Sequence, residues 1–88
     1  MSRGMPWRAR AQKQLDDNDI RVGQLWRFRV CHKPWLVRHE EYNALILGTK
    51  IVREGGKVRI LEMSPGETRQ IDMLADDLAY DAYLLADV

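Results

Sequence analysis

Two apolar-rich runs that meet at a glycine pair stand out in the pattern of hydrophobic and polar positions. They span residues 44–63, with Gly55 and Gly56 between them. Paired glycines reach the positive φ angles that a tight primed turn requires, and β-branched residues crowd both flanks. The pattern therefore predicts a β-hairpin with the glycine pair as its turn, which places Ile51 opposite Ile60.

A strand is also predicted ahead of this hairpin. In residues 20–31, Trp26 and Phe28 alternate with arginines, so one face of the strand is expected to be buried and the other cationic. Gly23 permits a tight turn or a bulge at its start. Trp26 is assigned to the core by its phase in the strand.

A long loop is predicted between this strand and the hairpin, and a covered strand is predicted where the hairpin begins. Residues 32–42 contain Pro34 and charges without a period, which predicts a long loop with a short strand-like centre at residues 35–37. Residues 45–47 are apolar at every position, which predicts a strand covered on both faces, and Gly48 allows a sharp bend.

After the hairpin, a turn and another strand are predicted. Residues 64–67, Ser-Pro-Gly-Glu, have the composition of a type II turn. Residues 68–73 then alternate, which places Ile71 and Met73 on the inward side of a strand.

Both ends of the chain carry helical patterns. Pro6 suits a first helical position, and Trp7, Ala11 and Leu15 form one stripe, which predicts a basic arm or short helix over residues 1–19. At the C-terminal end, two interpretations are open. Residues 74–88 fit one amphipathic helix, or a helical turn over 74–80 followed by a closing strand over 82–87, and the second buries more apolar side chains.

The opening of the first strand (residues 22–28), residues 58–61 and the Gly66-Glu67 turn resemble small uncharacterised SH3-like proteins encoded in phages and prophages. This resemblance implies a mainly β fold: a small SH3-like five-stranded barrel over residues 20–88, with the arm or short helix of residues 1–19 before it. It implies no activity, because fold does not determine function. Residues 23–26 also resemble the first strand of PemK-like ribonuclease toxins, although the Arg-Pro pair that opens that family's next strand is missing.

Length and composition bound the class of protein. A chain of 88 residues has room for one domain with one small core. Cys31 is the only cysteine, which excludes an internal disulfide and fits a reducing compartment. No apolar run approaches the length of a membrane span, so the expected location is the cytoplasm, or a virion if a phage encodes the chain.

Charge is distributed unevenly along the chain. Residues 1–38 hold nine basic and three acidic residues, whereas residues 39–88 hold five basic and ten acidic ones. One reading is that the basic half meets an anionic partner. The other is that the two halves neutralise each other within the fold.

No catalytic set or metal site is recognisable in the sequence. Cys31 ends the predicted strand and His32 follows it directly, and neighbours in extended backbone point to opposite faces, so the two side chains would not meet. His32, His39 and Glu40 lack a zinc-binding spacing, and the aspartates of residues 76–81 lack the glycine and spacing of a calcium loop. We therefore predict no enzymatic activity, no cofactor, no metal and no small-molecule substrate.

The first functional hypothesis is a protein-binding or assembly module. Two tryptophans lie beside basic residues in segments without a buried pattern, and aromatic and arginine side chains dominate interface hot spots. The partner is another protein or further copies of the chain. The predicted contact residues are Trp7, Arg8, Arg10, Trp35 and Arg38.

The alternative hypothesis is a nucleic-acid-binding barrel that uses the basic N-terminal half. A ribonuclease related to the toxins comes third. The predicted phosphate-contacting residues are Arg3, Arg8, Arg10, Lys13, Arg27 and Arg29.

Overall fold

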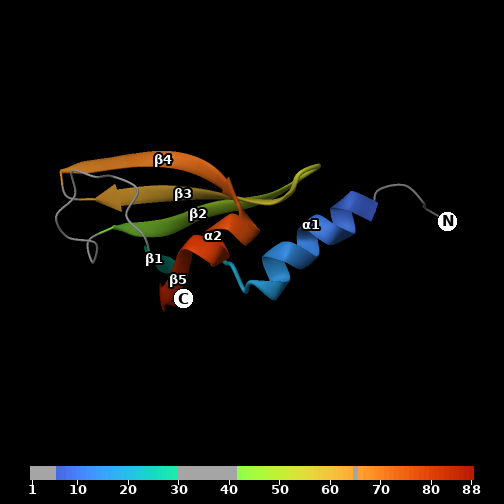
Figure 1. Cartoon of the computed structure of the whole chain (residues 1–88), viewed down its shortest axis with the longest axis horizontal. Coiled ribbons are helices and arrows are strands. Elements are labelled where there is room, and N and C mark those ends of the chain that lie inside the picture. The colour runs from blue at the N-terminus through green and yellow to red at the C-terminus, as the bar shows by residue number, and fades with distance from the viewer. Residues whose placement is uncertain (1–5, 30–41, 65) are drawn as a thin grey trace.

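The computed structural model describes residues 6–29, 42–64 and 66–88, which form a mainly β chain with two helices (Figure 1). The strands form one five-stranded antiparallel sheet with the order β4-β3-β2-β1-β5. The elements in chain order are α1 (Pro6–Asp17), β1 (Leu25–Phe28), β2 (Asn43–Val52), β3 (Gly55–Ser64), β4 (Glu67–Leu74), α2 (Ala75–Asp81) and β5 (Ala82–Ala86).

The mainly β, five-stranded prediction is confirmed, but the sheet is open, because β4 and β5 are its two edges. Between these edges in the chain lies α2, which contacts both strands and buries Ala75 and Leu78 completely. The helix thus packs into the core where strand pairing would be needed to close a barrel.

One face of the sheet, here called the inner face, carries the hydrophobic core. Alternate residues of β3 point to it, among them Val58 and Ile60, and both helices pack against it. Ala11 and Leu15 of α1 are buried, as their spacing predicted. The core cluster consists of Leu15, Ile20, Trp26, Phe28, Tyr42, Ala44, Ile46, Val58, Ile60, Ala75, Leu78 and Ala82.

The predicted hairpin exists, but its predicted turn and register are wrong. Val52 pairs with Gly55, so the turn consists of residues 53 and 54 and the glycines belong to β3. Ile51 lies opposite Gly56, and Ile60 lies opposite Ile46.

The glycine pair instead forms the close contact between β3 and α1. A Cβ atom on Gly56 would lie 2.7 Å from the Ala11 carbonyl oxygen and 2.7 Å from Leu15 Cγ, so only glycine lets the helix approach this closely. The Gly56 amide donates a hydrogen bond of 2.8 Å to Gln14 Oε1 of the same helix. Gly55 has a φ of 140°, a conformation that other residues rarely adopt.

A β-bulge interrupts β2 beside the predicted bend. Ile46 pairs with Ile60 and Gly48 with Arg59, which leaves Leu47 as the extra residue on β2. The predicted cover on both faces of this strand is wrong, because Leu47 is 37% exposed. Residues beyond the bulge are shifted by one place relative to β3, so the sheet's outer face takes up Lys50.

The other predicted elements are confirmed with small changes. Gly66 has a φ of 77°, as the third position of a type II turn requires, while residue 65 lies outside the described residues. Ile71 and Met73 face the core from β4. For the C-terminal end, the alternative of a helical segment followed by a strand is correct, although this strand is an edge of the sheet and does not close a barrel.

The first strand is shorter than predicted, because β1 begins at Leu25 rather than at residue 20. Gly23 has a φ of 96°, and the Gln24 side chain bonds back to the Arg21 amide and the Asp19 carbonyl. These contacts keep residues 19–24 in a turn. The predicted loop over residues 32–42 falls outside the described residues except for Tyr42.

Candidate functional site

A row of three leucines crosses the outer face of the sheet, the face opposite the two helices. Leu25 of β1 pairs with Leu45 of β2, and Leu45 pairs with Leu61 of β3. Paired residues of a ladder project to the same face, so these side chains are neighbours. All three are only partly buried. We call them the leucine row, and the exposed Leu47 lies beside it on β2.

Arginines lie at one end of the leucine row. Arg27 pairs with Tyr83 of β5 on one side and with Asn43 of β2 on the other, and its Nε donates a hydrogen bond of 3.2 Å to Asn43 Oδ1. The Arg29 guanidinium lies 5.3 Å from the centre of the Tyr83 ring, within the range of a cation–π contact. This end of the outer face is therefore cationic and carries one exposed aromatic ring.

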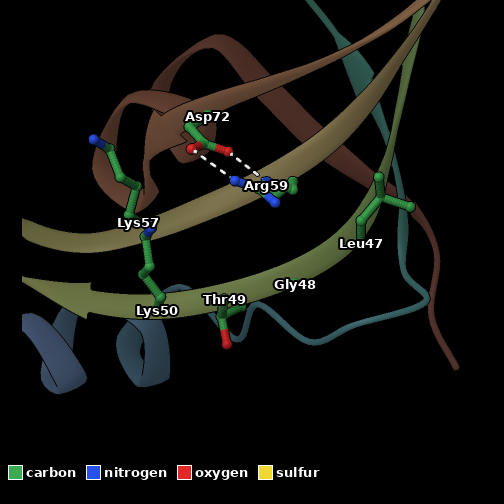
Figure 2. Close-up of a pocket in the computed structure, with 7 residues that line it drawn as sticks. All are labelled: Leu47, Gly48, Thr49, Lys50, Lys57, Arg59 and Asp72. Atoms are coloured by element: carbon green, nitrogen blue, oxygen red, sulfur yellow. Dashed lines mark hydrogen bonds and ion pairs between the residues drawn. The ribbon is translucent and has the colours of Figure 1, made fainter.

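A pocket of about 240 Å³ lies beyond the other end of the row (Figure 2). It opens across β2, β3 and β4, and its polar lining is dominated by cationic side chains. We call it the lysine pocket. Its lining residues are Leu47, Gly48, Thr49, Lys50, Lys57, Arg59 and Asp72.

Asp72 is the one acidic residue of this lining, and Arg59 neutralises it. Arg59 Nε lies 3.0 Å from Asp72 Oδ1 and Nη2 lies 3.4 Å from Oδ2, so the contact is two-pronged (Figure 2). The hydrogen bond from Arg59 lowers the pKa of the Asp72 carboxyl, partial desolvation opposes this effect, and the charges of Arg59, Lys50 and Lys57 lower it further. The carboxylate therefore stays ionised and fixes the guanidinium at the pocket wall.

The two lysines of the pocket leave its positive charge uncompensated. Lys50 and Lys57 are directly paired across β2 and β3, an arrangement in which like charges destabilise a sheet. Among the described residues, neither ammonium takes part in an ion pair or a side-chain hydrogen bond. An anionic group placed between the lysines would relieve their repulsion, so the pocket is suited to a carboxylate or a phosphate.

The structure places the predicted partner-binding residues of the arm on α1. Trp7 is half-buried in the first turn of the helix, and the Arg8 guanidinium lies 5.6 Å from the centre of its ring. Arg8 and Arg10 are exposed. Trp35 and Arg38 lie outside the described residues.

The predicted nucleic-acid contacts are divided between two surfaces. Arg8, Arg10 and Lys13 lie on α1, which packs on the inner face, and Lys13 is paired with Asp17 at 2.6 Å. Arg27 and Arg29 lie on the outer face. Arg3 lies outside the described residues.

The lysine pocket and the leucine row were missed by the sequence reasoning. Their alternation is visible in β3, where residues 57, 59 and 61 share a face, but their neighbours on β2 depend on the position of the turn and on the bulge at Leu47. Assigning the turn to residues 53 and 54 would have revealed the pocket, because this turn places Lys50 directly opposite Lys57.

One buried carboxylate lies on the inner face, away from these surfaces. Glu62 is 3% exposed and accepts hydrogen bonds of 2.9 Å from the Tyr42 hydroxyl and 2.9 Å from Arg69 Nε. These donors compensate its charge and join β3 to β4. Within residues 6–29, 42–64 and 66–88, no three His, Cys, Asp or Glu side chains are grouped as metal ligands. No helix in that part of the chain has the length and hydrophobicity to cross a membrane.

Comparisons of the chain with protein-family models, with curated protein sequences and with solved structures give no significant match.

Proposed function

We propose that the protein is a non-enzymatic binding module whose outer sheet face binds a protein segment with an apolar centre and acidic flanks. The carrying observation is the leucine row between two cationic ends. Arg27 and Arg29 lie at one end, and the lysine pocket lies at the other.

The chemistry of the two parts is complementary. Partly exposed leucines supply apolar area, which is worth about 25 cal/mol for each Å² removed from water. The cationic ends select acidic flanks and accelerate encounter, because electrostatic complementarity acts mainly on specificity and association rate. A carboxylate in the lysine pocket would relieve the repulsion between Lys50 and Lys57.

A peptide library panned on the whole protein tests the proposal. We expect the selected peptides to share apolar residues flanked by Asp or Glu. Their affinity should fall about tenfold or more in the L45T/L61T double variant, which keeps β-forming residues on the outer face. Random selected sequences, or affinity unchanged by this variant, would overturn the proposal.

The matched control is the R8E/R10E variant on α1. These residues are exposed and lie away from the leucine row. We expect it to bind the selected peptides as the wild type does. Loss of binding in this variant alone would show that the peptides bind at α1, where Arg8 and Arg10 were predicted as contact residues.

Nucleic-acid binding is a second candidate, and one observation favours it. Tyr83 with its stacked Arg29 shares the outer face with the lysine pocket, so an aromatic ring and several cations lie along one surface. A mobility-shift titration with single-stranded RNA at two salt concentrations tests it. Binding that weakens with salt and is lost on Tyr83→Ala supports this candidate, and no binding at low salt excludes it.

We also propose that the chain is related to small SH3-like barrel proteins. Five strands, two short turns and a helical segment before the last strand support it. A phage origin and a cytoplasmic location stay predictions.

A further inference from the structure

The two edges of the sheet differ in chemistry. The β4 edge exposes polar side chains over residues 67–70, Glu-Thr-Arg-Gln. On the β5 edge, Tyr83, Leu84 and Leu85 are 39%, 38% and 41% exposed. Edge strands are ordinarily protected from pairing by charges, prolines or bulges that turn them away. The β4 edge has charged side chains of this kind. Residues 82–86 contain neither a charge nor a proline, and the one irregularity of β5 is a register shift against β1 that leaves Leu85 as an extra residue.

We propose that β5 pairs antiparallel with β5 of a second copy, which joins two sheets into one across a two-fold axis. This inference is independent of the proposed binding of acidic segments, because it uses the edge of the sheet and not its outer face. A free edge satisfies its backbone groups by adding a strand, and apolar side chains on both faces of that strand are then covered as well.

The chain itself indicates that the occupant is a second copy. A strand that pairs with β5 must cover its three consecutive apolar residues, Tyr83, Leu84 and Leu85, and should therefore be apolar itself. Of the two sheet edges in the described residues, only β5 is apolar. Pairing β5 with itself is isologous, so both strands are used up by one contact. The remaining edges are the polar β4 strands, and the assembly therefore stops at a dimer.

The charges at the ends of β5 are compatible with this pairing. Asp81 precedes the strand and Asp87 follows it, so a contact centred on Leu84 places Asp81 of one copy near Asp87 of the other. Arg21 Nη2 lies 2.9 Å from Asp87 Oδ2, and the Gln24 side chain also donates to Asp87. Each end of the interface thus brings a cation together with its two carboxylates.

Sedimentation equilibrium of the whole protein tests the proposal. Over about a hundredfold range of concentration we expect a transition from one to two chain masses of 10.3 kDa, with no larger species. A monomer at every concentration, or a series of growing oligomers, would overturn it.

Charge placed on the edge should separate the two strands of the interface. Leu84→Lys should weaken the dimer at least about tenfold, whereas Thr68→Lys on the β4 edge should leave it unchanged. Equal loss in both variants would contradict the assignment to β5. Circular dichroism confirms that each variant is folded before its mass is compared.

Cross-linking keeps the proposal testable if Leu84→Lys fails to fold. In a Cys31→Ser background, Leu84→Cys should form an intermolecular disulfide under mild oxidation, because directly opposite residues of an antiparallel pair lie within disulfide range. Gln70→Cys on the β4 edge is the matched control and should stay monomeric. Cross-linking at residue 70 and not at residue 84 would overturn the inference.

Discussion

The indole N–H of Trp26 donates a hydrogen bond of 3.1 Å to Oε1 of Gln24, a side chain that is fully buried. The same oxygen accepts the Arg21 amide at 2.8 Å, and Gln24 Nε2 donates to the Asp19 carbonyl at 2.7 Å and to Asp87 at 3.1 Å. One amide group thereby joins the turn before β1, the core tryptophan and the C-terminal end.

Replacing Gln24 with leucine should lower the free energy of unfolding by about 3 kcal/mol. The change keeps the side-chain volume but leaves the buried Trp26 indole and backbone groups of the turn without partners, and each such loss costs about 1 to 3 kcal/mol. Urea denaturation followed by tryptophan fluorescence measures it. Gln12→Leu on the exposed side of α1 is the control and should change stability by less than about 0.5 kcal/mol. Equal effects of the two changes would contradict the assigned network.

Alanine at Gly56 should destabilise the fold by about 1 to 3 kcal/mol, because its methyl group overpacks the contact between β3 and α1. Gly48→Ala provides the matched comparison, since nothing lies within 4 Å of the position that its Cβ would take. That change should be neutral or stabilise the strand by about 0.5 kcal/mol. Thermal unfolding of both variants measures the difference, and a Gly56→Ala variant as stable as Gly48→Ala would rule out the close approach of the helix.

Lys57→Glu should stabilise the protein while weakening its binding to acidic peptides. The change replaces a directly opposed like-charge pair with an opposite-charge pair, which is worth about 0.2 to 1 kcal/mol. Melting temperature reports the first effect and peptide titration the second. Lys57→Gln removes the repulsion without adding attraction and should give an intermediate melting temperature. A lower melting temperature for Lys57→Glu would show that repulsion between Lys50 and Lys57 does not lower the stability of the fold.

The contribution of Asp72 should depend on pH in a defined direction. Its folded-state pKa lies below the ordinary value of 3.8, chiefly because of the hydrogen bond from Arg59. A lowered pKa means that the ionised form is favoured by folding, so its contribution is complete above the unfolded pKa and is lost as pH falls through the folded pKa. The stability difference between the wild type and Asp72→Asn should therefore be constant near neutral pH and shrink below about pH 4. Unfolding curves across this range measure it, and a difference that grows toward acid pH would contradict the assignment.

Periodicity predicted the elements whose buried stripe is local in sequence. The spacing of Ala11 and Leu15 identified α1, and of the two interpretations left open for residues 74–88, the helical segment followed by a strand is the one found. The phase of Trp26 likewise placed it in the core. In each case the pattern is set by contacts that the segment makes with one face.

The glycine pair shows where this reasoning ends. Glycine serves a tight turn and a close helix approach equally well, and the local sequence contains both possibilities. The contact between Gly56 and α1 decides between them, and its partner Gln14 is 42 residues away in the sequence. The lysine pocket was missed for the same reason, because its cross-strand neighbours follow from the turn and from the bulge.

The extra residue at Leu47 divides β2 into two functional halves. Odd-numbered positions such as Leu45 reach the outer face before it, and even-numbered positions such as Lys50 reach that face after it. The same residues in regular alternation, with no bulge, would send the Lys50 ammonium toward the helices and Ile51 to the outer face. The bulge thus lets one strand present an apolar segment and a charged end on the same face of the sheet.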